Sequence, residues 1–80
     1  MIEGVYMDIR TERILIAFSR TGLRQIDVCN MTGISKSLMS AYLSGRCFPG
    51  QENYEKLAQV FGVSVDYLRG FERDYHERQV

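Results

Sequence analysis

The sequence predicts an all-α domain of five short helices, and three observations support that prediction. Apolar residues recur in several segments at spacings of three and four, which is the period of one helix face. Glycines follow these segments, at points where a residue in the left-handed conformation ends a helix. Aspartate or serine precedes several of them, where a side-chain oxygen caps the first turn. A chain of 80 residues has room for one domain with a compact core.

The first predicted helix runs from a cap at Asp8 to about Arg20. It carries Ile14, Ala17 and Phe18 at the spacing i, i+3, i+4. These three side chains therefore lie on one face, which we expect to be buried in the core.

Residues 25–46 are the most informative segment, because they read as two helices joined at a glycine. Gly33 suits the sharp turn, since glycine adopts a positive φ without strain. Ser35 stands where its hydroxyl would cap the second helix of the pair. Met39 and Tyr42 share one face of that helix and are expected in the core. The opposite face carries only small or polar residues, namely Lys36, Ser37, Ser40, Ala41 and Ser44. This arrangement predicts a helix-turn-helix, whose second helix commonly enters the DNA major groove.

The remaining predicted helices cover residues 51–61 and 65–69. The longer one has an apolar stripe at i, i+3, i+4 and i+7, formed by Tyr54, Leu57, Ala58 and Phe61. Ser64 is placed to cap the shorter one. The chain then divides into an N-terminal arm (1–7), a helix-turn-helix domain (8–70) and a charged C-terminal tail (71–80).

The charge distribution fits a nucleic-acid partner better than the net charge of zero does. Between Arg10 and Arg46 the chain has six basic residues and two acidic ones, and six minus two leaves +4 in that stretch. Most acidic residues lie outside it. We therefore expect one face to meet phosphate while the acids lie elsewhere.

Several function classes are not supported by the sequence. No apolar run reaches the length of a membrane span, and no secretion signal is recognisable, so we expect a cytoplasmic protein without a membrane partner. We expect Cys29 to fill the core and Cys47 to be a free loop thiol. No Cys/His cluster has metal-ligand spacing, and no catalytic set is apparent. The expectation is therefore no enzyme, no metal and no cofactor.

From about Arg13 to Leu68 the chain resembles the Xre family, the phage repressor and Cro type of helix-turn-helix domain. The motifs that carry the resemblance are Gln25, Gly33-Ile34-Ser35-Lys36-Ser37, Gly45-Arg46, Pro49, Lys56-Leu57-Ala58 and Phe61-Gly62-Val63-Ser64-Val65-Asp66-Tyr67-Leu68. The resemblance implies a five-helix, lambda-repressor-like fold with the helix-turn-helix as its second and third helices. It also implies a phage or prophage type of transcriptional repressor that binds operator DNA as a dimer.

The resemblance also assigns roles to individual residues of this chain. The expected base-contacting residues are Lys36, Ser37, Leu38 and Ala41. The expected phosphate-contacting residues are Arg24, Gln25, Ser40, Ser44 and Arg46. Two positions depart from the family pattern. Arg24 stands where the family usually has a capping Ser or Thr, so the side-chain cap of that helix is expected to be lost. Thr32 replaces a usual aliphatic core residue.

The expected homodimer contact involves Leu68, Phe71 and Tyr75. The alternative function is a protein-interaction module, such as an antitoxin-like or adaptor protein, and an additional protein partner is compatible with either function. The sequence is compatible with a complete protein and with the DNA-binding part of a longer one.

Overall fold

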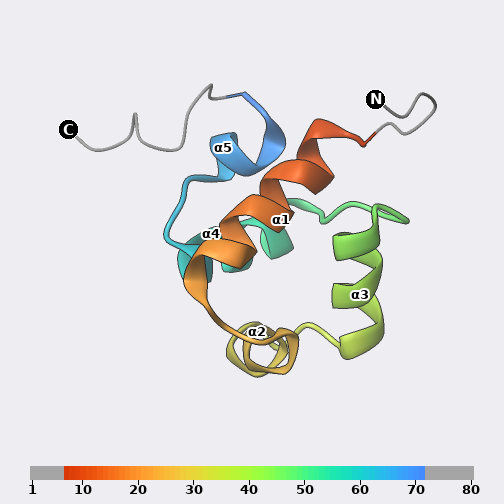
Figure 1. Ribbon diagram of the computed structural model, residues 1–80, viewed down its shortest axis with the longest axis vertical. Coiled ribbons are helices and arrows are strands. Elements are labelled where there is room, and N and C mark those ends of the chain that lie inside the picture. Colours follow the sequence, from red (N-terminus) through yellow and green to blue (C-terminus); the bar gives the residue numbers. More distant parts are fainter. Residues whose placement is uncertain (1–6, 72–80) are drawn as a thin grey trace.

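The computed structural model describes residues 7–71, which form five α-helices and contain no strand. The helices are α1 (Ile9–Thr21), α2 (Gln25–Thr32), α3 (Lys36–Ser44), α4 (Gln51–Phe61) and α5 (Val65–Arg69). The predicted all-α class and the order of the helices are confirmed. In Figure 1, α1 (orange) crosses the molecule diagonally, with α2 (yellow) at its lower end, α5 (blue) beside its upper part and α3 (green) to one side.

The helix starts follow the predicted capping chemistry. The carboxylate Oδ1 of Asp8 accepts a hydrogen bond of 2.8 Å from the backbone N–H of Arg10, which starts α1. The hydroxyl of Ser64 accepts one of 2.9 Å from the backbone N–H of Tyr67, which starts α5. Each bond satisfies an amide that has no partner inside its helix. Local sequence therefore sets where these helices begin.

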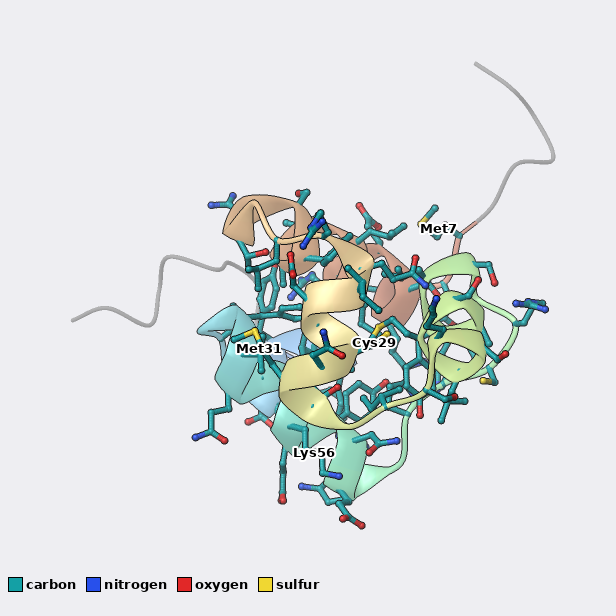
Figure 2. All side chains as sticks on the ribbon, turned by 90° about the horizontal axis from the view of Figure 1, so that it is seen from below. Met7, Cys29, Met31 and Lys56 are labelled. Atoms are coloured by element: carbon teal, nitrogen blue, oxygen red, sulfur yellow. The ribbon has the colours of Figure 1, made fainter. Side chains whose placement is uncertain are left out.

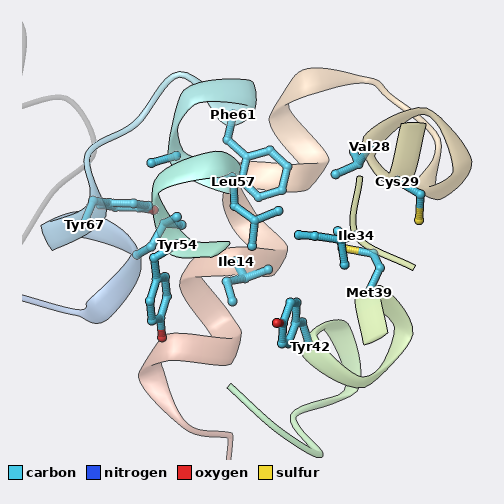
Figure 3. Close-up of a cluster of buried hydrophobic side chains, with 13 residues drawn as sticks. Ile14, Val28, Cys29, Ile34, Met39, Tyr42, Tyr54, Leu57, Phe61 and Tyr67 are labelled. Carbon is cyan, nitrogen blue, oxygen red and sulfur yellow. The ribbon is translucent and has the colours of Figure 1, made fainter. Parts of the chain in front are cut away.

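The core lies between α1, α4 and the α2–α3 pair. Its largest fully buried side chains are Ile14, Val28, Met39, Leu57 and Leu68, which come from all five helices. The first four of these are labelled in Figure 3. The ring centroids of Phe18 and Phe61 lie 6.2 Å apart, within the range of favourable aromatic pairs. The predicted core faces of the first and fourth helices are confirmed, although Phe18 is half-buried.

Helix α5 is fastened to α1. The Nη1 of Arg13 donates a hydrogen bond of 3.0 Å to the carbonyl of Tyr67, and the guanidinium carbon lies 4.4 Å from the centre of the Tyr67 ring. A Cβ added at Gly70, which has φ +89°, would lie 2.9 Å from Cγ2 of Ile9. Position 70 is therefore both left-handed and tightly packed, and only glycine satisfies both conditions without a shift.

Candidate nucleic-acid interface

The turn between α2 and α3 is built as the sequence predicts. Gly33 follows α2 with φ +81°, and a Cβ at this position would meet no atom within 4 Å. Glycine is therefore favoured here by the backbone conformation and not by lack of space. The hydroxyl of Ser35 then accepts a hydrogen bond of 3.1 Å from the N–H of Leu38, which caps α3.

Thr32 stabilises this turn from inside. Its hydroxyl donates a hydrogen bond of 2.7 Å to the carbonyl of Val28 and accepts one of 3.1 Å from the N–H of Ile34. Thr32 itself is 7% exposed. The departure from an aliphatic residue thus has a structural reason, because the hydroxyl satisfies a buried backbone amide that an aliphatic side chain would leave without a partner.

The inner face of α3 is anchored in the core. Met39 and Tyr42 are 0% and 3% exposed, and Ile34 enters the same cluster from the turn (Figure 3). The hydroxyl of Tyr42 accepts a hydrogen bond of 2.8 Å from the side-chain amide of Asn53 on α4. The predicted orientation of the helix is confirmed, and its outer face is fixed as a consequence.

The outer face of α3 carries most of the residues expected to contact DNA. Lys36, Ser37, Ser40 and Ser44 are exposed, and Ala41 is half-buried. Within residues 7–71, Lys36 forms no ion pair. The N-terminal end of the helix therefore presents an unpaired ammonium group and a hydroxyl.

Leu38 is less exposed than Lys36 and Ser37, the two expected base-contacting residues that precede it. It is half-buried and packs against the hydrophobic core cluster. Part of its apolar surface is therefore already in contact with the protein, and only the remainder faces solvent.

Arg24 and Asp27 are hydrogen-bonded to each other at the start of α2. The Arg24 side chain caps nothing, as expected, but the carboxylate of Asp27 accepts a hydrogen bond of 2.9 Å from the Arg24 backbone N–H. The guanidinium returns two further bonds to the same carboxylate, of 3.1 and 3.0 Å. These side-chain hydrogen bonds lower the pKa of Asp27 and raise the pKa of Arg24.

The Arg24 guanidinium is thus exposed but already paired in the free protein. Gln25, the other residue expected near phosphate at this end, is half-buried at the first position of α2. Asp27 was not among the predicted residues of this region, although an acid three residues after the N-cap is a known signal for a cap made by a side chain inside the helix.

Arg46 is held at the opposite end of α3. Its Nε donates a hydrogen bond of 3.0 Å to the hydroxyl of Ser44, and its backbone N–H donates one of 3.0 Å to the carbonyl of Ala41. The Arg46 side chain is exposed and lies just after the helix. Two expected phosphate contacts, Ser44 and Arg46, are therefore brought together as one polar unit.

Helix α1 supports the end of α3 and the loop that follows it. A Cβ at Gly45 would lie 3.2 Å from the hydroxyl oxygen of Thr11, so the two helices approach closely there. The Arg10 guanidinium is bound to Asp8 and lies 3.7 Å from the centre of the Phe48 ring, as a cation–π contact. Thr11 was not among the predicted core residues. It precedes the core residue Ile14 by three positions, but its side chain is polar and so did not indicate burial.

The predicted dimer residues have different environments. Leu68 is 0% exposed because it packs in the core of this chain, so it offers no surface to the expected dimer contact. Phe71 is 73% exposed. Tyr75 lies outside the described residues.

The described residues were also compared with the expectations for the cysteines, a metal site and a membrane span. Cys29 is buried and Cys47 is half-buried, both as free thiols, in agreement with the predicted core and loop positions. Residues 7–71 contain no group of three or more His, Cys, Asp or Glu residues arranged to hold a metal ion. No helix in this range is long and apolar enough to cross a membrane.

Comparison with known protein families gives a match over most of the described chain. Residues 17–70 match the family model described as a helix-turn-helix domain, which covers all of α2, α3, α4 and α5 and part of α1. No curated protein and no solved structure gives a significant match. The matched range contains the exposed face of α3 and every residue expected to contact DNA.

Proposed function

The chain belongs to the helix-turn-helix domain family, and from that premise we propose that it is a sequence-specific DNA-binding transcriptional regulator. The observation that carries the proposal is the two-sided character of α3. Its inner face is fixed in the core by Met39 and Tyr42, while Lys36, Ser37 and Ser40 are exposed on the other face. A rigid helix with a small polar outer face is suited to close approach in the major groove.

Base reading is assigned to the N-terminal end of α3. Lys36 donates to guanine O6 or N7, and Ser37 bonds to several base edges. Ala41 contacts a thymine methyl group, and the exposed part of Leu38 contributes a similar apolar contact. Because Ala41 is small and Leu38 is half-buried, we assign most of the sequence preference to Lys36 and Ser37.

Phosphate contacts are assigned to residues on both sides of the reading residues. Ser44 and Arg46 form one group after α3, with Ser40 one turn earlier on the outer face. Gln25 and Arg24 form the other group, at the start of α2. Arg24 is paired with Asp27, so its contribution to phosphate binding is reduced by a neighbouring negative charge.

We further propose that the regulator is a repressor of the Xre type and acts as a homodimer on operator DNA. A single helix-turn-helix covers a few base pairs, and two copies related by twofold symmetry supply a longer site. The expected operator is therefore a palindrome whose half-sites lie about one helical turn, roughly 34 Å, apart.

A charge-reversal comparison tests DNA binding. Arg46→Glu is compared with Lys56→Glu, which makes the same charge change on α4, outside the α2–α3 pair, at a residue that pairs with Glu52. Duplexes selected from a random pool are titrated at two salt concentrations. We expect Arg46→Glu to weaken binding to all duplexes and Lys56→Glu to have a much smaller effect. Absence of wild-type binding at low salt, or binding that does not weaken with salt, would contradict the proposal.

A second candidate function is a module that binds another protein, such as an antitoxin-like or adaptor protein. It is favoured by the net charge of zero and by the exposed apolar side chains of Met31, which lies on α2 (Figure 2), and Phe71, which are 59% and 73% exposed. The same charge reversal distinguishes the two candidates, since a protein-only module keeps its partner when Arg46 becomes glutamate.

A further inference from the structure

The start of α1 contacts the loop that follows α3 on both sides of Arg46. On one side, a Cβ at Gly45 would lie 3.2 Å from the hydroxyl oxygen of Thr11, so the backbone there lies close to α1. On the other side, the guanidinium carbon of Arg10 lies 3.7 Å from the centre of the Phe48 ring. In Figure 1 the segment between α3 and α4 (green) runs back toward α1. Arg46 is exposed between these two contacts.

The ring of Phe48 depends on Arg10 for its position. Phe48 is half-buried, and among residues 7–71 it is not one of the side chains that pack against the hydrophobic core cluster, whereas the preceding Cys47 is. The guanidinium lies over the ring face, where the ring quadrupole attracts a cation. The attraction is lost when the ring moves out from under the cation. The contact therefore fixes the ring against α1.

Arg10 is itself held in place by Asp8. The Nε and Nη2 atoms of Arg10 each donate a hydrogen bond of 2.9 Å to the carboxylate of Asp8. Two parallel bonds fix the guanidinium plane more closely than one bond does. The carboxylate also offsets the positive charge, which reduces the attraction of Arg10 for phosphate. Arg10 is thus better suited to hold the loop than to bind DNA directly.

We propose that Arg10 is a positioning residue for phosphate binding, because its contact with Phe48 holds the loop that presents Arg46. This inference rests on the proposed function, in which Ser44 and Arg46 contact phosphate. A loop that is ordered only on binding loses conformational entropy at that step, whereas a loop that is already held loses less. The Arg10–Phe48 contact therefore strengthens DNA binding without contacting DNA.

Amide hydrogen exchange of the full chain without DNA tests the structural part. Phe48→Leu removes the ring and changes no charge, and Phe18→Leu is the matched control at another half-buried ring, which lies near Phe61. The backbone N–H of Arg46 donates to the carbonyl of Ala41, so its exchange rate reports local opening of the loop. We expect Phe48→Leu to speed this exchange about two- to fivefold, the range for loss of an exposed cation–π contact, and the control to leave it unchanged.

Titration of the folded variants with a selected duplex tests the functional part. We expect Phe48→Leu to bind about two- to fivefold more weakly than wild type, and Phe48→Tyr, which keeps an aromatic ring, to restore the affinity. Phe18→Leu is expected to bind as wild type does. In an Arg46→Ala background, Phe48→Leu is expected to cause no further loss, because the side chain that the loop positions is absent.

Replacing the Asp8–Arg10 pair tests Arg10 itself. Asp8→Asn combined with Arg10→Met removes the guanidinium without changing the net charge, and asparagine still caps α1. We expect the same loss of affinity as in Phe48→Leu. Adding Phe48→Leu to this variant is expected to cause no further loss, because both changes remove one contact. Additive losses would show that Arg10 affects binding by another route and would overturn the inference.

Three further outcomes would overturn the inference: unchanged exchange of the Arg46 amide in Phe48→Leu, wild-type affinity in Phe48→Leu, or an equal loss of affinity in Phe18→Leu. Circular dichroism of each variant checks that the helices are intact. If the wild-type chain binds no duplex, the proposed function fails, and the exchange measurement alone decides whether the Arg10–Phe48 contact holds the loop at Arg46.

Discussion

The hydroxyl of Tyr42 accepts a hydrogen bond of 2.8 Å from Nδ2 of Asn53, which links the buried face of α3 to the first turn of α4. Tyr42 is 3% exposed, so this bond is protected from solvent on the tyrosine side. The core thus holds α3 by apolar contacts and by one specific polar contact. Apolar packing is non-directional, whereas a hydrogen bond depends on angle. The Tyr42–Asn53 bond therefore helps to fix how α3 is rotated about its own axis, and so which residues form its outer face.

Removing that bond is expected to cost stability. Tyr42→Phe keeps the ring in the core and deletes the hydroxyl, which we expect to lower the free energy of unfolding by about 1 kcal/mol. A double-mutant cycle with Asn53→Ala, measured by urea denaturation, isolates the pair. We expect the two effects to be less than additive, because either change removes the same bond. Full additivity would show that the bond contributes nothing.

The cap of α3 is expected to affect both stability and DNA binding. Ser35→Ala and Ser64→Ala each remove a hydroxyl that accepts from a backbone N–H at a helix start. We expect each to cost about 1 kcal/mol of unfolding free energy. Only Ser35→Ala is expected to weaken duplex binding when the folded protein is titrated, because α5 is outside the proposed interface. Equal loss of affinity in both variants would contradict the placement of the interface on α3.

The Arg24–Asp27 pair is expected to limit phosphate binding. Asp27→Asn removes the negative charge and keeps an oxygen that accepts from the Arg24 N–H. The guanidinium is then available to phosphate. We expect tighter binding to all duplexes. The slope of log K against log salt is expected to become steeper by up to about 0.9, the value for one additional phosphate contact. An unchanged slope would show that Arg24 does not reach phosphate.

Acid is expected to weaken the start of α1. Hydrogen bonds from the Arg10 side chain and backbone lower the pKa of Asp8 from 3.8 to about 2. Since the folded pKa is below the unfolded one, this contribution is present above 3.8 and is lost as the pH falls toward about 2. Urea denaturation across this window tests it. Asp8→Asn is expected to show a smaller loss of stability over the same range, and an equal loss in both proteins would contradict the assignment.

The helices were predictable from sequence because local chemistry sets their ends. Gly33, with φ +81°, and the capping hydroxyl of Ser35 fix the turn without help from distant residues. The inner face of α3 was predictable for a similar reason, since Met39 and Tyr42 follow the helical period. A residue whose role depends only on its neighbours in sequence is readable before the fold is known.

Features that depend on tertiary packing were not predictable in the same way. Leu68 was expected at a surface but is enclosed by the core, because its burial depends on how α5 packs against α1 and α4. The close contact of Thr11 with Gly45 joins residues more than thirty positions apart. Asp27 is a different case, since its role as a cap depends only on its position three residues after Arg24 and is readable from the sequence.

NMR of the ¹⁵N-labelled protein, titrated with a selected duplex, tests the proposed contact between DNA and the outer face of α3. We expect the largest amide shifts at residues 35–46 and around Arg24 and Gln25, with small shifts at the exposed residues Glu55, Gln59 and Asp66 on α4 and α5. Shifts concentrated on α4 and α5, with the amides of Lys36 and Ser37 unchanged, would show that α3 is not the DNA-binding helix.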